Sequence, residues 1–168
     1  MLIKNHDDTS GIGWLVGIGI VIMAVLAGML FLGSKSPFEG KTNREVALIC
    51  TSDMATQFHI HPHLQIVING VQQEMPANIG IQSECMNAIH THDASGTIHV
   101  ESPEKRDFTL DDFFAVWGKS FNKNQILDYK ADTTHHVKVT VNGKETQEFE
   151  NTVMHDGDKI IISYEAKK

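Results

Sequence analysis

Six of the chain's ten histidines lie in two short stretches, where five of them alternate with other residues and the sixth follows a turn. They are His59, His61 and His63 in HIHPH, and His90, His92 and His99 in IHTHDASGTIHVE. Every second side chain of an extended strand points to the same face, so two such strands side by side would gather several imidazoles. Neutral imidazole is a common protein ligand for copper and zinc. The spacing therefore predicts a copper or zinc site on a β scaffold, with copper slightly preferred.

Three further residues extend this predicted site. Glu101 lies two positions after His99 on the same predicted face, where it could bind the ion or hold a ring nitrogen of a ligating histidine. Cys50 and Cys85 are the only cysteines. They could form a disulfide outside the cytoplasm, remain as two inert thiols, or leave Cys85 free to bind metal as a thiolate five residues before His90.

Two similar segments indicate how the scaffold is built. HLQIVING and HHVKVTVNGK are rich in β-branched residues and end in Asn-Gly, a strong signal for a β-hairpin. A His-Asp pair, at His92 and at His155, follows each segment and precedes another apolar run. We interpret residues 58–103 and 134–166 as two hairpin-containing halves, either a duplication or two generic hairpin motifs. Each half is expected to form a second hairpin at its His-Asp pair.

An alignment of the two halves predicts that the histidines face inward. His90 aligns with Val153, and His99 aligns with Ile161 or Ile162, which are apolar and expected to be buried. Burial of a polar ring without a partner costs about 1–3 kcal/mol. Several inward imidazoles therefore need hydrogen-bond partners or a shared ion.

A short helix is predicted between the halves, in FTLDDFFAVWGKSF. Thr109 can cap its first turn together with Asp112, and Gly118 can end it. Its aromatic side chains are expected to pack on the sheet. Residues 45–57 could begin with either a short helix or an extended segment. The expected fold is therefore a mainly β (α+β) domain with one short packing helix, attached to a single transmembrane helix.

The transmembrane helix is predicted at residues 12–33, which contain no charged side chain and are long enough to cross a bilayer. Residues 1–11 would form a tail, 34–44 a linker, and 45–168 the His-rich domain. The positive charges flanking the span slightly favour a cytoplasmic domain, but two cysteines and a metal-collecting domain favour the oxidising exterior, which we choose. Gly13 and Gly17 form a small-xxx-small pair that could pack on a partner helix of a larger membrane complex.

The charge and motif content exclude other classes of function. A formal net charge of −7 argues against nucleic-acid binding. The sequence contains no phosphate-binding glycine loop, no G-x-S-x-G and no H-E-x-x-H. Three histidines and a carboxylate around an open position are also how metal catalysts are built, so an enzyme stays an alternative.

The combination of HIHPHLQIVING, MPANIGI, CMNAIHTHDASGTIHVESP and FTLDDFFAVWG resembles a family of membrane-anchored bacterial and archaeal proteins of unassigned activity. The resemblance covers about residues 59–118, with a weaker continuation to the C-terminus. This chain departs from the family pattern at Asp111, where glycine is usual, in the predicted helix and away from the histidines. The resemblance implies a membrane anchor and a His-rich domain, and it names no substrate.

Three functions follow as expectations. The first is a membrane-anchored, extracytoplasmic metal-binding protein that stores, senses or delivers copper or zinc. The second is an accessory subunit of a membrane complex, in which the histidines form a hydrogen-bonded core. The third is a metal-dependent extracytoplasmic enzyme.

Overall fold

The computed structural model describes residues 38–167. The chain divides after Glu39, and the fold described below is the unit that begins at Gly40. The predicted tail, the predicted transmembrane helix and its Gly13–Gly17 pair lie outside the described residues. Among residues 38–167, no helix is long and apolar enough to cross a membrane.

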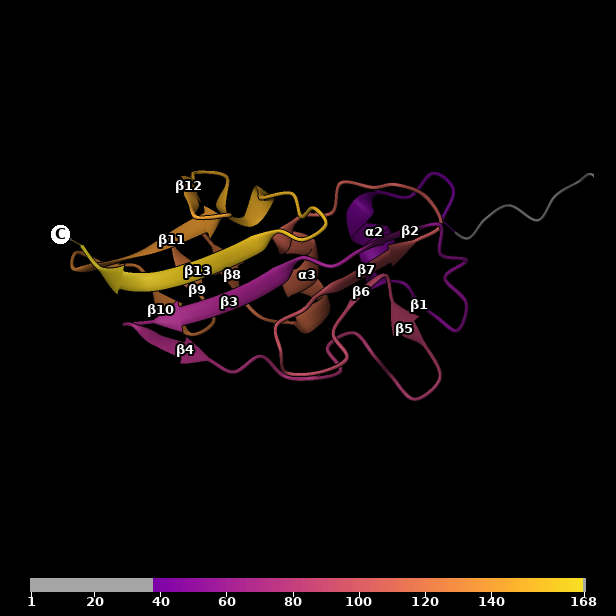
Figure 1. Ribbon diagram of the computed structural model, residues 1–168, viewed down its shortest axis with the longest axis horizontal. Coiled ribbons are helices and arrows are strands. Elements are labelled where there is room, and N and C mark those ends of the chain that lie inside the picture. The colour runs from indigo at the N-terminus through magenta and orange to yellow at the C-terminus, as the bar shows by residue number, and fades with distance from the viewer. Residues whose placement is uncertain (1–37, 168) are drawn as a thin grey trace, which may run out of the picture. The chain divides into compact units, whose positions relative to one another are not determined.

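The described region is mainly β with two short helices, and its largest element is a five-stranded sheet in the order β12-β11-β13-β3-β4 (Figure 1). Its strands are β3 (His63–Ile68), β4 (Val71–Gln73), β11 (His135–Val141), β12 (Lys144–Thr146) and β13 (Lys159–Ala166). Neighbouring strands are antiparallel except for β13 and β3, which run parallel.

Alternating burial explains the register of this sheet. In β3 every second residue is buried, and the same period of two runs through the middle of β13. The parallel register places Leu64 opposite Ile160 and Ile66 opposite Ile162, so the apolar side chains of both strands share the core face. A slip by one residue would turn that face to solvent.

Both predicted Asn-Gly hairpins are confirmed. Asn69-Gly70 joins β3 to β4, and Asn142-Gly143 joins β11 to β12. All four residues have positive φ, between 50° and 82°, as a two-residue hairpin turn that matches the twist of the strands requires.

The second predicted pair of hairpins is confirmed only in the first half. His92-Asp93 begins the loop between two antiparallel strands, β6 (Ile89–His90) and β7 (His99–Ser102). At His155-Asp156 the prediction is wrong, because the preceding Val153 bridges to Thr109 while β13 pairs with β11 and β3. The two halves therefore continue into different sheets after their Asn-Gly hairpins.

The smaller sheets complete the β structure. A three-stranded sheet has the order β2-β7-β6, with β2 at Phe58–Ile60. The other short strands are β1 (Cys50–Thr51) with β5 (Met86–Asn87), and β8 (Phe121–Asn122) with β9 (Gln125–Ile126) and β10 (Tyr129–Lys130). A 3₁₀ turn, η1, spans Phe149–Asn151.

The HIHPH stretch does not form one strand, contrary to the expectation that its three histidines share a strand face. The chain leaves β2, in the β2-β7-β6 sheet, after Ile60 and enters β3, in the five-stranded sheet, at His63. Pro62 stands at the break, where it has no N–H to donate to a sheet ladder. Its carbonyl instead accepts the N–H of Ile98 at 2.9 Å, and the N–H of His63 reaches Asp158 O at 2.8 Å.

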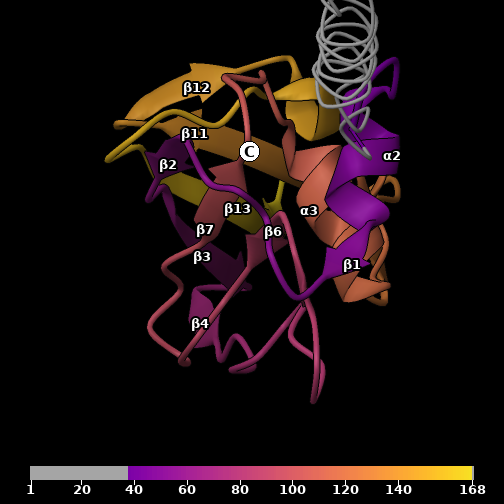
Figure 2. The ribbon, with the colours of Figure 1, turned by 90° about the vertical axis from the view of Figure 1, so that its right-hand side faces the viewer.

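Two helices lie on one side of the described unit (Figure 2), where the sequence predicted one and left a second open. The predicted helix is α3 (Leu110–Trp117), and its Thr109–Asp112 capping box and left-handed Gly118 end are as predicted. The second is α2 (Asn43–Leu48), which settles the question left open for residues 45–57 in favour of a short helix.

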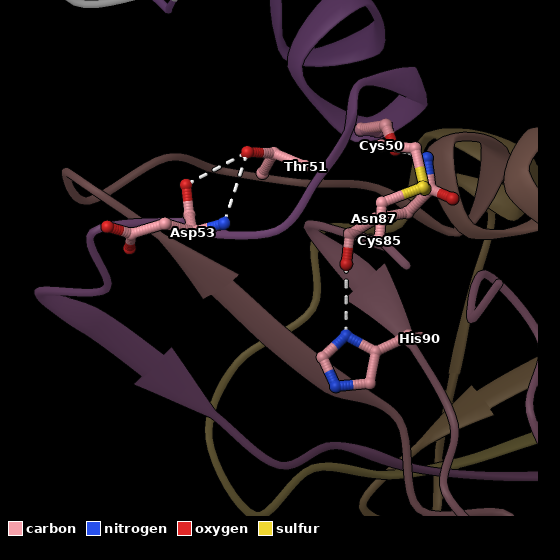
Figure 3. Close-up of a disulfide and its surroundings, with 7 residues drawn as sticks. Cys50, Thr51, Asp53, Cys85, Asn87 and His90 are labelled. Atoms are coloured by element: carbon pink, nitrogen blue, oxygen red, sulfur yellow. Dashed lines mark hydrogen bonds between the residues drawn. A yellow bond between two sulfur atoms is a disulfide. The ribbon is translucent and has the colours of Figure 1, made fainter. Parts of the chain in front are cut away.

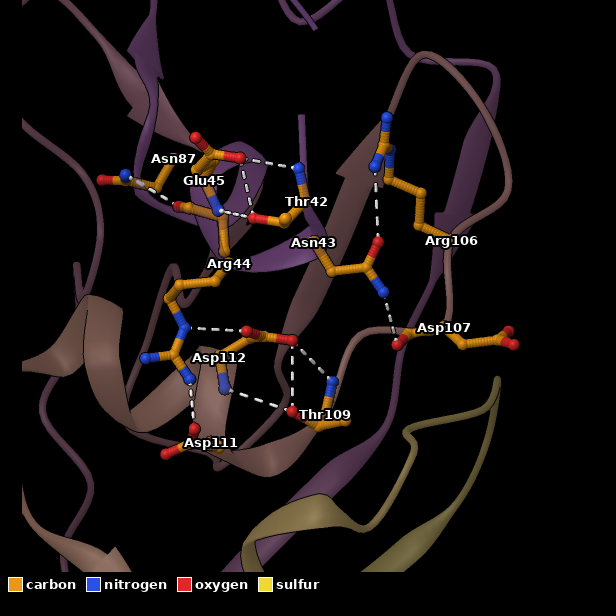
Figure 4. Close-up of polar contacts among 11 residues, drawn as sticks. Thr42, Asn43, Arg44, Glu45, Asn87, Arg106, Asp107, Thr109, Asp111 and Asp112 are labelled. Atoms are coloured by element: carbon orange, nitrogen blue, oxygen red, sulfur yellow. Dashed lines mark hydrogen bonds and ion pairs between the residues drawn. The ribbon is translucent and has the colours of Figure 1, made fainter. Parts of the chain in front are cut away.

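Arg44 joins the two helices (Figure 4). Its Nε donates to Asp112 Oδ1 at 2.8 Å, and its guanidinium also pairs with Asp111. Because the Asp112 carboxylate also caps α3 through Thr109, one buried carboxylate holds both helices. α3 in turn packs against β6, the strand that carries His90.

Candidate metal centre

Five of the six predicted histidines meet at the β2-β7-β6 sheet. His99 lies in the central strand β7 and is the register partner of His90 in β6. His59 lies in β2, on the other side of β7, opposite Glu101. His61 directly follows β2, and His92 lies two residues after His90, the last residue of β6. Two groups of three result, each with ligand atoms within 4.8 Å of one another: His90, His92 and His99, called here the inner triad, and His59, His61 and His99, the outer triad.

The inner triad is anchored by a fully buried histidine. His90 has no exposed surface, and its Nδ1 lies 3.0 Å from the backbone carbonyl of Asn87. A carbonyl only accepts, so Nδ1 carries the ring proton and the lone pair is on Nε2. That Nε2 lies 3.2 Å from His92 Nε2. Burial lowers the pKa of His90 to about 4, which keeps the ring neutral and available as a ligand.

The outer triad is more open to solvent. His59 and His61 are exposed, and their ring centroids lie 4.3 Å apart. His59 Nε2 lies 3.4 Å from His99 Nδ1. His99 is half-buried, and its pKa is lowered first by burial and then by the neighbouring rings of His92, His61 and His59. Crowding thus disfavours protons on the shared histidine and leaves its lone pair free for a cation.

Two carboxylates lie beside the outer triad. Glu101 Oε1 lies 3.2 Å from His59 Nε2, but Glu101 belongs to neither triad, which favours the supporting role among the two that the sequence allowed. Asp156 accepts the backbone N–H of His61 at 2.8 Å and lies 3.6 Å from its Nδ1. Asp156 was not predicted from the sequence, because nothing in its Asp-Gly turn signals contact with a residue 95 positions earlier.

His63 does not join the cluster and is a correction to the predicted ligand set. It begins β3 on the far side of Pro62, where it bridges to Thr97. The Cε1 atom of His63 packs against Gly96, where a Cβ atom on Gly96 would lie only 3.2 Å away from it. The break at Pro62 therefore separates His63 from His59 and His61, and neither triad includes it.

Cys85 is the second correction, because it forms a disulfide with Cys50 and a disulfide sulfur is not a thiolate ligand (Figure 3). The disulfide is one of the three alternatives that the sequence left open, and such a bond is typical of an extracytoplasmic domain. It also bears on the site. Cys50 is the register partner of Asn87, whose carbonyl orients His90, and the Asn87 side chain donates to Ala47 O at 3.0 Å.

The remaining histidines of the described region lie elsewhere and each faces a carboxylate. The pairs are His135 with Asp132, His136 with Glu165, and His155 with Asp158. None belongs to a triad within residues 38–167.

The donor set fits a transition-metal ion. For a Zn–N distance of about 2.0–2.1 Å, two ligands of a tetrahedral ion lie about 3.3–3.4 Å apart. The two close nitrogen pairs of the cluster, at 3.2 and 3.4 Å, match this separation. His99 supplies a third nitrogen to the inner triad and leaves a coordination position open.

Comparisons with protein-family models, with curated proteins and with solved structures each find no match to this chain. The family resemblance of the sequence therefore stays a prediction, and the function rests on the histidine cluster.

Proposed function

We propose that this protein binds copper or zinc at the inner triad of His90, His92 and His99 and serves to store, sense or deliver the ion. The observation that carries the proposal is the pair of facing Nε2 atoms at 3.2 Å, with one ring fixed by a backbone carbonyl and held neutral by burial. Ligating histidines commonly donate their other ring nitrogen to such a carbonyl.

The uneven burial of the inner triad favours exchange of the ion over a purely structural role. His90 is buried, His99 is half-buried and His92 is exposed. Buried His90 would hold the ion from one side, while solvent or a partner could reach it from the side of exposed His92. A site that receives an ion and passes it on needs such access. A structural zinc site is instead closed by four protein ligands.

The disulfide and the apolar segment 12–33 support a place at the outer face of a membrane. In this proposal the chain is a single-pass membrane protein whose domain collects the ion outside the cytoplasm. Gly13 and Gly17 offer a helix face to a larger membrane complex that would take the ion.

Metal titration of the full-length chain tests the proposal. The protein is stripped with EDTA and dialysed, then titrated with Cu²⁺ or Zn²⁺, and bound metal is measured by elemental analysis. We expect at least one ion per chain, with tight binding lost in His92→Asn. His92 is exposed, so this change spares the core, whereas His90→Ala also opens a cavity.

His155→Asn is the matched control, because His155 is exposed and faces a carboxylate outside the cluster. It should bind as the unsubstituted chain does. Equal binding by the unsubstituted chain and by His92→Asn would refute the inner triad as the site, and so would the absence of bound metal.

A further inference from the structure

Building on this proposed function, we infer that the cluster holds two cations, one in each triad, and that His99 is a ligand to both. The proposed function needs only the inner ion. The second ion would sit with His59 and His61 at the exposed end of the cluster.

The five histidines of the cluster do not converge on one point. Two nitrogens bound to the same ion are separated by at most about 4.2 Å, twice a metal–nitrogen bond. Among the described residues, no group of ligand atoms within 4.8 Å joins His59 or His61 to His90 or His92. One ion therefore cannot use both ends of the cluster.

Each end of the cluster already has one pair of nitrogens at the separation of two ligands of a tetrahedral ion. At the inner end the pair is His90 Nε2 and His92 Nε2, 3.2 Å apart. At the outer end it is His59 Nε2 and His99 Nδ1, 3.4 Å apart. The two pairs share no atom, so both can be used at once.

His99 stands between the two ends. Its ring meets His61 edge-on at 86° and His92 edge-on at 76°, with centroids 4.8 and 4.6 Å away. With Nδ1 directed to His59, Nε2 is the nitrogen that remains for the inner ion. Binding through both nitrogens requires the ring to release its N–H proton to solvent, and the two cations stabilise the imidazolate that results.

The carboxylates at the outer end offset the charge of a second ion. Glu101 Oε1 lies 3.2 Å from His59 Nε2, so in the ion-free cluster that nitrogen carries the ring proton and donates a hydrogen bond to Glu101. The incoming cation replaces this proton, which leaves to solvent, while Glu101 remains as an adjacent anion. Asp156 beside His61 adds a second negative charge. The exposed outer ion is expected to exchange faster than the inner one.

Titration of the full-length chain with Cu²⁺, followed by elemental analysis and electron paramagnetic resonance, tests this inference. We expect two copper ions per chain and a resonance intensity well below the copper content, because copper ions bridged by an imidazolate couple magnetically. The double variant His59→Asn/His61→Asn should bind one ion and show full intensity. Retention of that ion shows that the variant is folded.

The outcomes separate the two proposals. Saturation of the unsubstituted chain at one ion, unchanged in the double variant, overturns the second site and leaves the proposed function standing. Two ions with full resonance intensity overturn the sharing of His99. Absence of copper binding overturns the two-ion cluster, and absence of both copper and zinc binding overturns the proposed function as well.

Discussion

Protonation of buried His90 should destabilise the ion-free protein in mild acid. The pKa of His90 is lowered from 6.5 to about 4 by burial, so between these values the unfolded chain binds a proton that the folded protein does not. The free energy of unfolding therefore rises with pH across this window. The contribution of neutral His90 to the free energy of unfolding is almost fully present above pH 6.5. It is lost as the pH falls towards 4, and the titration of His90 causes no further loss below that pH.

The size of the effect follows from the same values. The full difference corresponds to about 3 kcal/mol, and about 2 kcal/mol of it is lost between about pH 7 and pH 5. Because His90 has no exposed surface, solvent screening does not reduce this figure. A loss of about 2 kcal/mol is a large share of the roughly 5–15 kcal/mol free energy of unfolding of a typical domain.

Urea unfolding of the full-length chain in EDTA, followed by circular dichroism at the two pH values, measures the effect. His90→Leu lowers the overall stability but removes the titrating group, so its loss between the two pH values should be smaller than that of the unsubstituted chain by about 2 kcal/mol. If both proteins lost the same free energy, His90 would not be the buried neutral ring that the inner triad requires.

Two further perturbations test the scaffold around the site. The Cys50–Cys85 bond closes a loop with a sequence separation of 35, so Cys50→Ser/Cys85→Ser should lower the free energy of unfolding by up to about 4 kcal/mol. Urea unfolding without reductant measures this loss. No change would mean that the cross-link does not restrict the unfolded chain. Arg44→Ala removes a charged partner from buried Asp112 and should lower the free energy of unfolding by about 1–3 kcal/mol. Asp111→Ala, at the half-exposed partner of Arg44, should lower it by less than about 1 kcal/mol. Equal losses of stability in thermal unfolding would contradict this ranking.

Local signals in the sequence predicted the parts of the fold that depend on neighbouring residues. The two Asn-Gly hairpins and the capped helix ending at Gly118 are set by backbone preferences within a few positions. The alternating positions of the histidines likewise predicted that they form a cluster. These features need no knowledge of distant contacts, so a single sequence is enough to find them.

The missed features depend on contacts between distant segments. Whether the HIHPH stretch continues in the same sheet is decided by Ile98 and Asp158, which bind the two ends of the Pro62–His63 peptide bond. That choice removes His63 from the site. The contact of Asp156 with His61 depends on the same crossing and has no local signal.

The ion-free inner triad satisfies its own hydrogen bonds, which explains how a buried imidazole cluster folds before it meets a metal. His90 Nδ1 donates to the Asn87 carbonyl, so His90 Nε2 can only accept, and His92 must donate from its Nε2 at 3.2 Å. An ion that binds between these nitrogens replaces that one proton. His92 must then carry its proton on Nδ1.

This exchange predicts a change of tautomer confined to one ring. In ¹⁵N-labelled protein, long-range ¹H–¹⁵N spectra should show His92 protonated on Nε2 in EDTA and on Nδ1 with Zn²⁺, while His90 keeps its proton on Nδ1 in both states. A structural hydrogen-bonded core, as an accessory subunit would have, gives the first state with or without zinc. Movement of the His90 proton instead would mean that the Asn87 carbonyl does not fix the buried ring, and the inner triad would lose the preorganisation on which its use as a metal site depends.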